Sequence, residues 1–243
     1  MPLERAEEAR AVILDLFPEG FEEVTLGTEI ELAAYTHSEG ATRLSSVLGR
    51  VETAAVEPGW EESWRRFHCP VRVGPLWIGP PWERPERDAL PVVIDPGRAF
   101  GTGAHPTTRL CLELLLGRRR TSFLDLGCGS GVLAVAAATL GFAPVVALDA
   151  DSVAVEATRA NAVANGVELE VRRADVLADP LPEAGLAVAN VDVSVAARLG
   201  PRVEASWLVT SGYLAAERPA PAGWEASERR VEEGWAADLF VRG

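Results

Sequence analysis

The sequence of 243 residues contains no lysine, and all 23 of its basic residues are arginine. Its 36 acidic residues outnumber them and set the formal net charge at −13. A chain this acidic lacks the basic face that neutralises phosphate groups, which argues against direct binding to nucleic acid. A basic protein partner fits the charge balance better. We attribute the absence of lysine itself to compositional bias of the coding genome.

Cysteine is also scarce. The three cysteines, Cys69, Cys111 and Cys128, are odd in number and too widely spaced for a disulfide framework or a metal knuckle. We therefore expect reduced thiols and no metal site. Cys128, which lies within a glycine-rich turn, is expected to fill space there and not to act as a nucleophile.

Long apolar runs are missing as well. Four glycines and one proline divide the longest uncharged run, residues 127–148, so it predicts a turn, a helix and a strand in series and not a membrane span. The first eight residues are charged where a secretory signal would need an apolar core. We expect a cytoplasmic protein, a monomer, with no membrane partner.

Hydrophobic residues make up 48% of the chain, enough for one large core and a small domain beside it. Residues 1–57 predict a small α+β domain in the order helix, hairpin, helix, strand. Its predicted elements are a helix over residues 3–17, strands over 21–25 and 29–35, a helix over 41–48 and a strand over 50–56. One strand ahead of the first helix would complete a ferredoxin-like unit, and none is evident, so the domain is ferredoxin-like in a complete or truncated form.

Residues 58–98 differ in composition. Seven prolines fall between Pro70 and Pro96, and four of the seven tryptophans fall between Trp60 and Trp82. Proline stiffens a chain and tryptophan supplies contact area, so this segment predicts a connector that packs onto a domain.

From residue 99 onward strands and helices alternate, which predicts a catalytic domain (99–243) built on a doubly wound parallel sheet. The predicted helices cover residues 110–116, 131–140, 152–165 and 195–204, and the predicted strands cover 122–126, 145–148, 168–172, 186–190 and 207–211. Two further strands, 224–231 and 235–241, follow each other so closely that they predict a terminal hairpin with an antiparallel strand.

A glycine turn is the sharpest local signal in this domain. Residues 124–131 read LDLGCGSG, a strand that runs into glycines and then opens a helix. Glycines let a ligand approach the backbone, and a helix N-terminus offers unpaired N–H groups, so Gly127 and Gly129 predict a nucleotide-like ligand. A dinucleotide loop would have its last glycine where Val132 stands, which disfavours an NAD-dependent oxidoreductase.

An acidic residue completes the fingerprint. Asp149 ends the next predicted strand, 22 residues after Gly127, where a carboxylate grips the two hydroxyls of a ribose. The alternative, that Asp149 caps the following helix, fits Asp151 or Ser152 better. Asp175, after the third strand, lies where an adenine amino group could be bound, or it is a solvated turn residue.

The segment IDPGRAFGTGAHPTT at residues 94–108, followed by the glycine turn, resembles the PrmA family of ribosomal-protein methyltransferases, which trimethylate large-subunit ribosomal protein eleven. The resemblance runs from about residue 60 to 212. It implies a class I methyltransferase fold, S-adenosylmethionine as cofactor, and an N-terminal domain that grips the protein substrate. By this resemblance the site residues are Phe100, Thr102 and Thr108 in a loop over the cofactor, Gly127 and Gly129 beneath it, Asp149 at the ribose, and Asn190 beside the transferred methyl.

The chemistry agrees with the resemblance. Methyl transfer is an in-line displacement that needs alignment and exclusion of water, not a nucleophile from the enzyme. Asn190 is the expected catalytic residue, because its side-chain oxygen can accept a hydrogen bond from the amine. His105 is expected to shape the loop, not to serve as a general base. Alternatives left open are methylation of another protein or a small molecule, and a binding module without turnover, which Asp192 after Asn190-Val191 raises.

Overall fold

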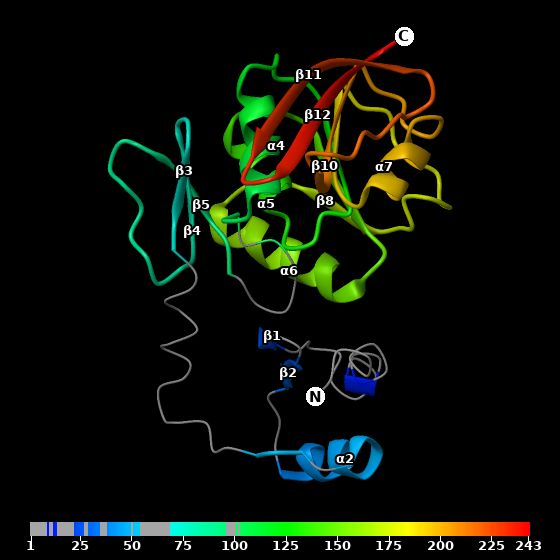
Figure 1. Cartoon of the computed structure of the whole chain (residues 1–243). Coiled ribbons are helices and arrows are strands. Elements are labelled where there is room, and N and C mark those ends of the chain that lie inside the picture. The colour runs from blue at the N-terminus through cyan, green and yellow to red at the C-terminus, as the bar shows by residue number, and fades with distance from the viewer. Residues whose placement is uncertain are drawn as a thin grey trace. The chain divides into compact units, whose positions relative to one another are not determined.

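The computed structural model describes residues 9, 12–13, 22–26, 29–34, 38–49, 51–53, 69–95, 101 and 103–243 (Figure 1). The chain divides into two compact units, Met1–Glu61 and Glu62–Gly243. Within the described residues, no helix combines the length and apolar character needed to cross a bilayer.

The first unit contains an antiparallel pair of strands followed by a helix. Strands β1 (Glu22–Leu26) and β2 (Glu29–Ala33) pair with Glu22 opposite Ala33, and α2 covers Ser38–Leu48. Both strands and this helix were predicted. Ala9 and Ile13, one helical turn apart in the predicted first helix, are helical and buried.

The predicted strand over residues 50–56 is wrong where it can be compared, since residues 51–53 form no strand. Its alternating pattern suits a half-buried surface, but a strand exists only through hydrogen bonds to a neighbour. Among the described residues of the first unit, β1 and β2 bond only to each other. The ferredoxin-like arrangement is therefore not confirmed.

The second unit begins with a small sheet that the sequence analysis did not predict. Strands β3 (Val71–Val73), β4 (Leu76–Gly79) and β5 (Leu90–Val93) lie in that order, within the predicted connector. Leu76, Ile78 and Val92 are fully buried in the same core as α4 and α5, so this sheet belongs to the second unit. Trp77 is buried too, as expected of a core tryptophan.

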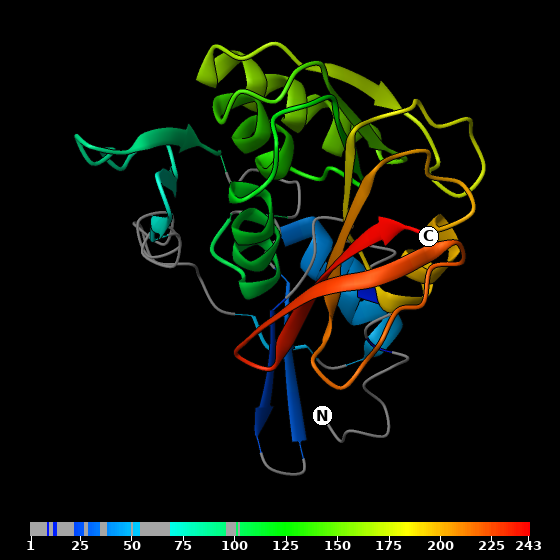
Figure 2. The same ribbon diagram turned by 90° about the horizontal axis from the view of Figure 1, so that it is seen from above.

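Seven strands form the main sheet in the order β11-β12-β10-β9-β6-β7-β8. The two C-terminal strands, β11 and β12, are drawn orange and red in Figure 2 and pair with each other. Their bounds are Phe123–Leu126 (β6), Val145–Asp149 (β7), Glu170–Arg173 (β8), Leu186–Asn190 (β9), Trp207–Leu214 (β10), Trp224–Glu232 (β11) and Trp235–Arg242 (β12). Strands β6 to β10 are parallel, and β12 pairs antiparallel with both β10 and β11. The doubly wound sheet and its antiparallel terminal strand are confirmed.

Alternating side chains bury both faces of this sheet, as parallel strands require. Along β9, Leu186 and Val188 enter the core shared with α4 (Pro106–Leu116) and α5 (Val132–Thr139), whereas Ala187 and Ala189 enter the core on the other face. Helix α6 (Ser152–Asn165) packs with α5, and α7 (Val193–Leu199) packs against β10.

Three helices differ from their predicted bounds by two residues or more, and α2 is one of them, since it begins at Ser38 and not at residue 41. The predicted helix 110–116 begins earlier, at Pro106, because His105 caps it and proline suits the first helical position. The predicted helix 195–204 begins at Val193 and ends at Leu199, because Gly200 and Pro201 follow.

Candidate functional site

The glycine turn lies at the carboxyl end of β6, between β7 and β9, where an open parallel sheet forms its ligand-binding crevice. Gly127, Gly129 and Gly131 all have positive φ angles, of 79°, 55° and 81°. The N–H groups of Gly127 and Cys128 both donate to the carbonyl of Leu148, at 2.8 and 3.0 Å. The turn is thus fixed to the end of β7.

The space around two of these glycines is also limited. A Cβ on Gly131 would lie 2.7 Å from Thr158 Cγ2 of α6, and one on Gly127 would lie 3.2 Å from Val191 Cγ1. The turn is therefore packed tightly against α6 on one side and the segment after β9 on the other.

Asp125 of β6 supports the turn from within the core. It is 1% exposed, and its Oδ2 accepts from the N–H of Ala134 in the first turn of α5 at 3.1 Å. Burial raises the pKa of this carboxyl to about 7; the nearby Asp149 carboxylate also raises it, and the Ala134 hydrogen bond opposes the shift.

Asp149, at the end of β7, contacts the glycine turn directly. Its Oδ2 accepts from the N–H of Gly129 at 2.9 Å, and its Oδ1 accepts from the N–H of Asp151 at 3.0 Å. Asp151 is the residue that caps α6, through a 2.9 Å bond from Val153 N–H. The capping role belongs to Asp151, as expected, and the turn and the acid of the predicted fingerprint are in contact.

The loop between β5 and α4 is tied to this turn at two points. Near its start, Asp95 N–H donates to Asn161 Oδ1 at 3.0 Å, and Asn161 Nδ2 donates to the carbonyl of Ser130 at 2.8 Å. Farther along, the Ser130 hydroxyl donates to the carbonyl of Gly101. Phe100 and Thr102, predicted to lie over the cofactor, fall outside the described residues.

The sequence analysis missed Asn161 and its neighbour Asn165, which exchanges hydrogen bonds with the backbone of Val93 at 2.7 and 2.6 Å. A signal was present: the two asparagines are four residues apart, on one face of a helix rich in alanine and valine. Buried polar side chains need partners, and here the partners are backbone groups of β5 and of the turn.

Asn190 ends β9, and its Nδ2 lies 3.2 Å from Thr107 Oγ1 and 3.4 Å from Thr108 Oγ1. Both threonines are buried at the start of α4. The structure thus brings Thr108 and Asn190 together, as predicted for residues of one site, and adds Thr107, which was not predicted.

Asp175 follows β8 and is exposed. Its Oδ1 accepts from Leu177 N–H, and its own N–H donates to Asp179 Oδ2, both at 2.8 Å. These bonds form a tight polar turn, in line with the alternative of a turn residue. The N–H of Ala174 donates to the carbonyl of Asp149 at 2.8 Å, so the turn adjoins the end of β7, and the adenine role stays a prediction.

Two side chains are excluded from reactive roles by their surroundings. Burial raises the pKa of the Cys128 thiol to about 12, and its Sγ lies 3.3 Å from Thr158 Oγ1, so it stays a thiol. Asp192 caps α7 and accepts from the N–H groups of Ser194 and Val195 at 2.9 and 3.1 Å. Hydrogen bonds from Ser194 and Val195 lower the pKa of this exposed carboxyl, and capping explains its presence after Asn190-Val191.

In the described part of the chain no three His, Cys, Asp or Glu side chains gather as metal ligands.

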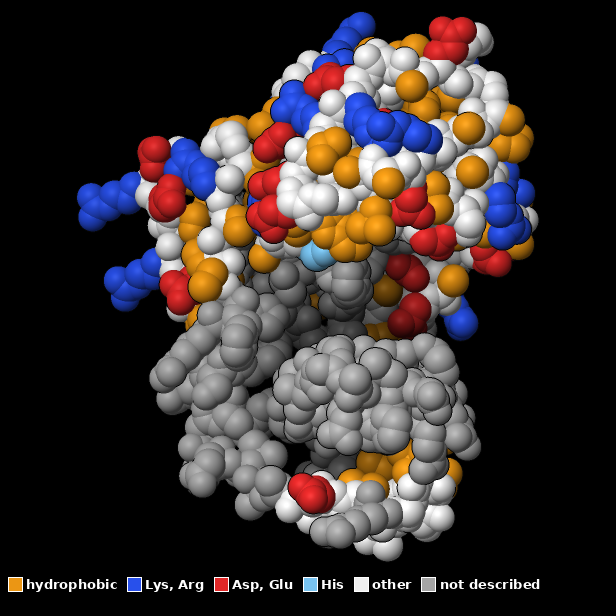
Figure 3. Space-filling model, in the orientation of Figure 1, with side chains coloured by type: hydrophobic (Ala, Val, Ile, Leu, Met, Phe, Trp, Pro, Cys, Tyr) orange, Lys and Arg blue, Asp and Glu red, His pale blue; other side chains and the backbone are white. Residues whose placement is uncertain are grey.

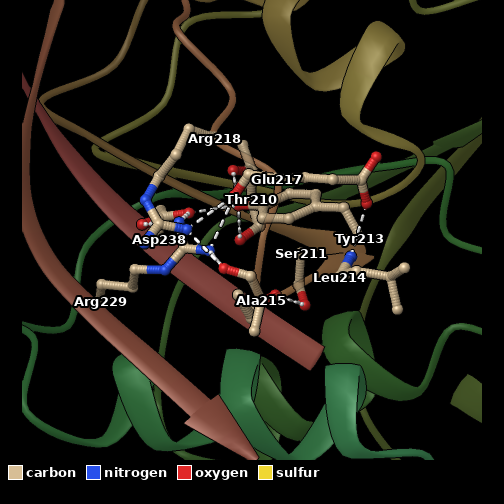
Figure 4. A network of polar contacts seen from close by, with 10 residues as sticks. Thr210, Ser211, Tyr213, Leu214, Ala215, Glu217, Arg218, Arg229 and Asp238 are labelled. Atoms are coloured by element: carbon tan, nitrogen blue, oxygen red, sulfur yellow. Dashed lines mark hydrogen bonds and ion pairs between the residues drawn. The ribbon is translucent and has the colours of Figure 1, made fainter. Parts of the chain in front are cut away.

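A buried polar network braces β10 where it passes Asn190 (Figure 4). Ser211 of β10 is opposite Asn190 in the parallel register, and two residues later the Tyr213 hydroxyl lies 2.8 Å from Asp238 Oδ2. Arg229 Nη1 pairs with the same oxygen at 2.8 Å, and its Nη2 donates to the carbonyl of Ala215 at 2.9 Å. The charge of Asp238 is thus compensated, and the network fixes the strand that flanks β9.

A parallel sheet in this strand order, with an inserted antiparallel strand and with a glycine turn and an acid at neighbouring strand ends, defines the fold of class I methyltransferases. Within that class, a model of the family Ribosomal protein L11 methyltransferase (PrmA) matches residues 6–238, so the chain belongs to this family. The resemblance seen in the two motifs is confirmed.

Relatives agree with the family match. A ribosomal protein L11 methyltransferase of Symbiobacterium thermophilum is 43% identical over 187 residues, which are 71% of this chain and 62% of that protein. One of Pseudomonas putida strain GB-1 is 47% identical over 163 residues, which are 65% of this chain and 55% of that protein. The matches thus span about six tenths of the length of these relatives.

The crystal structure of ribosomal protein L11 methylase from Lactobacillus delbrueckii subsp. bulgaricus is similar as well, with a TM-score of 0.63 and 26% identity. The match covers 71% of this chain and 98% of that one.

Proposed function

We propose that the chain is an S-adenosylmethionine-dependent N-methyltransferase that modifies lysine or N-terminal amino groups of a large-subunit ribosomal protein. The contact between the Asp149 carboxylate and Gly129 N–H, at the ends of adjacent strands, carries the proposal. It joins a ribose-gripping acid to a glycine turn, the two parts of a nucleoside site. Asn190 lies on β9, the strand on the other side of β6, where an acceptor amine would meet the methyl group.

The residues fit this cofactor. Gly127 has a φ of 79° and no Cβ, so a ligand can approach the backbone of the turn closely. Asp149 accepts one hydrogen bond on each carboxylate oxygen and keeps acceptor capacity for a ribose diol. When bound, S-adenosylmethionine supplies a methyl group activated by a positively charged sulfur. The residues proposed to hold it are Phe100, Thr102, Thr108, Gly127, Gly129, Asp149, Asp175 and Asn190.

The protein's own part is to position the amine and exclude water. An ordinary lysine has a pKa of about 10.4, so the amine must lose a proton before it reacts, and desolvation favours its neutral form. Asn190 Oδ1 would accept an N–H of this amine and orient its lone pair. No nucleophile of the enzyme is needed in this step.

For the substrate, the names of the relatives support ribosomal protein L11. We propose that residues 1–57 form an α+β, ferredoxin-like recognition domain and that 99–243 carry the chemistry, while β3 to β5 of the predicted connector, 58–98, pack in the core of the second unit. Residues 1–60 contain 12 acidic residues and 4 arginines, a charge that suits a basic ribosomal protein.

The test is to incubate the purified chain with S-adenosylmethionine and the candidate ribosomal protein, and to follow the acceptor by mass spectrometry. We expect mass gains in steps of one methyl group, and none with Asn190→Ala, which should still bind S-adenosylhomocysteine in calorimetry. If the chain binds the cofactor but no acceptor gains mass, the chain is a binding module without turnover. If a different acceptor gains mass, the chain is a methyltransferase, but the proposed substrate is wrong.

A further inference from the structure

His105 caps α4 with an acceptor atom. Its Nδ1 accepts from the backbone N–H of Thr107 at 3.4 Å, and the same Nδ1 lies 2.8 Å from Thr107 Oγ1. Because a backbone N–H can only donate, Nδ1 carries no proton. The neutral ring is then protonated at Nε2, and the Thr107 hydroxyl donates its one proton to Nδ1.

The direction of the Thr107 hydroxyl proton determines the orientation of the Asn190 side-chain amide. With its proton committed to His105, Thr107 Oγ1 can only accept, and the group that faces it at 3.2 Å must be the donor Nδ2 of Asn190. The reverse orientation would set Asn190 Oδ1 against an oxygen that has no proton to give. Thr108 Oγ1, at 3.4 Å from Nδ2, lies on the same side of the amide.

The imidazole ring is itself held in place. It makes an edge contact with Trp235, the first residue of β12, with ring centroids 4.8 Å apart. Arg109 donates to the carbonyl of Ala104 and pairs with Glu232 and Glu233 at 3.0 and 2.9 Å. Burial and the Arg109 charge lower the pKa of His105, against the pull of Glu233, so the neutral form prevails near pH 7. In the view of Figure 3, arginine, acidic and apolar side chains are interspersed over the described surface of the second unit.

We propose that His105 is a positioning residue of the transfer reaction: through Thr107 it selects the orientation of the Asn190 amide that leaves Oδ1 available to the acceptor amine. The inference rests on the proposed function for the identity of that amine. It gives His105 no contact with the substrate and no role as a general base.

Two matched pairs of variants test this relay, the hydrogen-bonded series from His105 through Thr107 to Asn190. His105→Asn places an acceptor oxygen where Nδ1 lies, whereas His105→Gln moves the polar group outward, toward Nε2. Thr107→Ser keeps the hydroxyl, whereas Thr107→Val removes it and retains the N–H that α4 needs for its cap. We expect kcat to fall about 10- to 100-fold in the Gln and Val variants, with KM for S-adenosylmethionine nearly unchanged, and to recover in the Asn and Ser variants.

A general base at Nε2 would give a different pattern. Asn and Gln at position 105 would then lose activity equally, the acidic limb of the pH profile would disappear, and the proposal would be overturned. Wild-type kcat in Thr107→Val would overturn it as well. Calorimetry with S-adenosylhomocysteine checks that each variant is folded.

The tautomer supplies a readout that needs no activity. In two-bond ¹H–¹⁵N spectra of the unliganded protein near pH 7, we expect Nδ1 of His105, assigned with the Asn variant, to be the unprotonated nitrogen. A ring protonated at Nδ1 would overturn the relay. Failure of the wild type to bind S-adenosylhomocysteine would instead reject the proposed function, and the tautomer would still decide whether the relay exists.

Discussion

Asp125 and Asp149 lie on neighbouring strands, β6 and β7, in unlike surroundings. Asp125 is buried with one backbone partner, whereas Asp149 is partly exposed and accepts from the glycine turn. Asp125 bonds the start of α5, whereas Asp149 bonds the glycine turn and is the residue proposed to bind the ribose.

The buried carboxyl makes the stability of the protein depend on pH. The pKa of Asp125 is about 7 in the folded chain against an ordinary value of 3.8, so between these two values the folded chain keeps a proton that the unfolded chain has lost. Stability therefore falls as pH rises through this window. The stability of Asp125→Asn lacks this dependence. Relative to the wild type, we expect the unfolding free energy of Asp125→Asn to increase by on the order of 1–4 kcal/mol between about pH 4 and pH 7.

Urea unfolding of both proteins across the window measures the difference. Carboxylates that do not interact with Asp125 contribute equally to both proteins and cancel. Parallel stability profiles would show that Asp125 is already ionised when folded.

For Asp149 we expect Asp149→Ala to weaken binding of S-adenosylhomocysteine by on the order of 1–3 kcal/mol, because hydrogen bonds to a charged group are lost. Asp151→Ala is the matched control. It removes the cap of α6, which costs about 1 kcal/mol of stability, and should leave cofactor affinity unchanged. Equal affinity of both variants by calorimetry would reject the ribose assignment.

The sequence predicts a ribose role for Asp149, at a strand end, and a capping role for Asp151 or Ser152, ahead of a helix. It could not reveal the side chains that hold the site together. Thr107 and Asn161 act through backbone and side-chain partners that are distant in sequence. Only the folded chain shows that Asn161 of α6 bonds the backbone of Asp95, two residues after β5.

At the scale of elements, the turn between β6 and α5 depends on glycine for two separate reasons. Gly131 has φ of 81°, and any Cβ there would meet Thr158, whereas Gly166 after α6 has φ of 64° and open space around it. Gly166→Ala isolates the cost of backbone strain, which is about 1 kcal/mol. We expect Gly131→Ala to lose on the order of 1–3 kcal/mol more, measured by urea unfolding, because it adds an overpacking term. Equal losses would mean that α6 yields to the added methyl.

Prediction of elements succeeded where periodicity was strong. Strand β9 was predicted with both of its bounds, and α6 with its closing glycine. Strands β3 to β5 were missed because they are short and lie among prolines, which depress strand propensity. The start of α4 was missed because its cap is a histidine, which is not among the usual capping residues.

At the scale of the whole molecule, the cysteines report on the integrity of the second unit. Cys69 is exposed, whereas Cys111 and Cys128 are buried, and burial raises the pKa of both buried thiols. We expect one thiol to react quickly with a chromogenic disulfide in native buffer and the other two only on unfolding. Cys69→Ser should abolish the fast phase alone; a fast phase that persists in this variant would show that the core opens in the native state.

The antiparallel strand has a consequence for the order in which the site can form. Strand β12 is the last of the seven in sequence, yet it lies inside the sheet between β10 and β11, and its first residue, Trp235, packs against His105. While the chain is being synthesised from its N-terminus, β11 has no strand to pair with until β12 emerges. Until then the His105 ring also lacks its contact with Trp235. The glycine turn can be complete on a nascent chain well before the asparagine amide is oriented, so under the proposed function the ability to transfer a methyl group would be among the last properties to arise during translation.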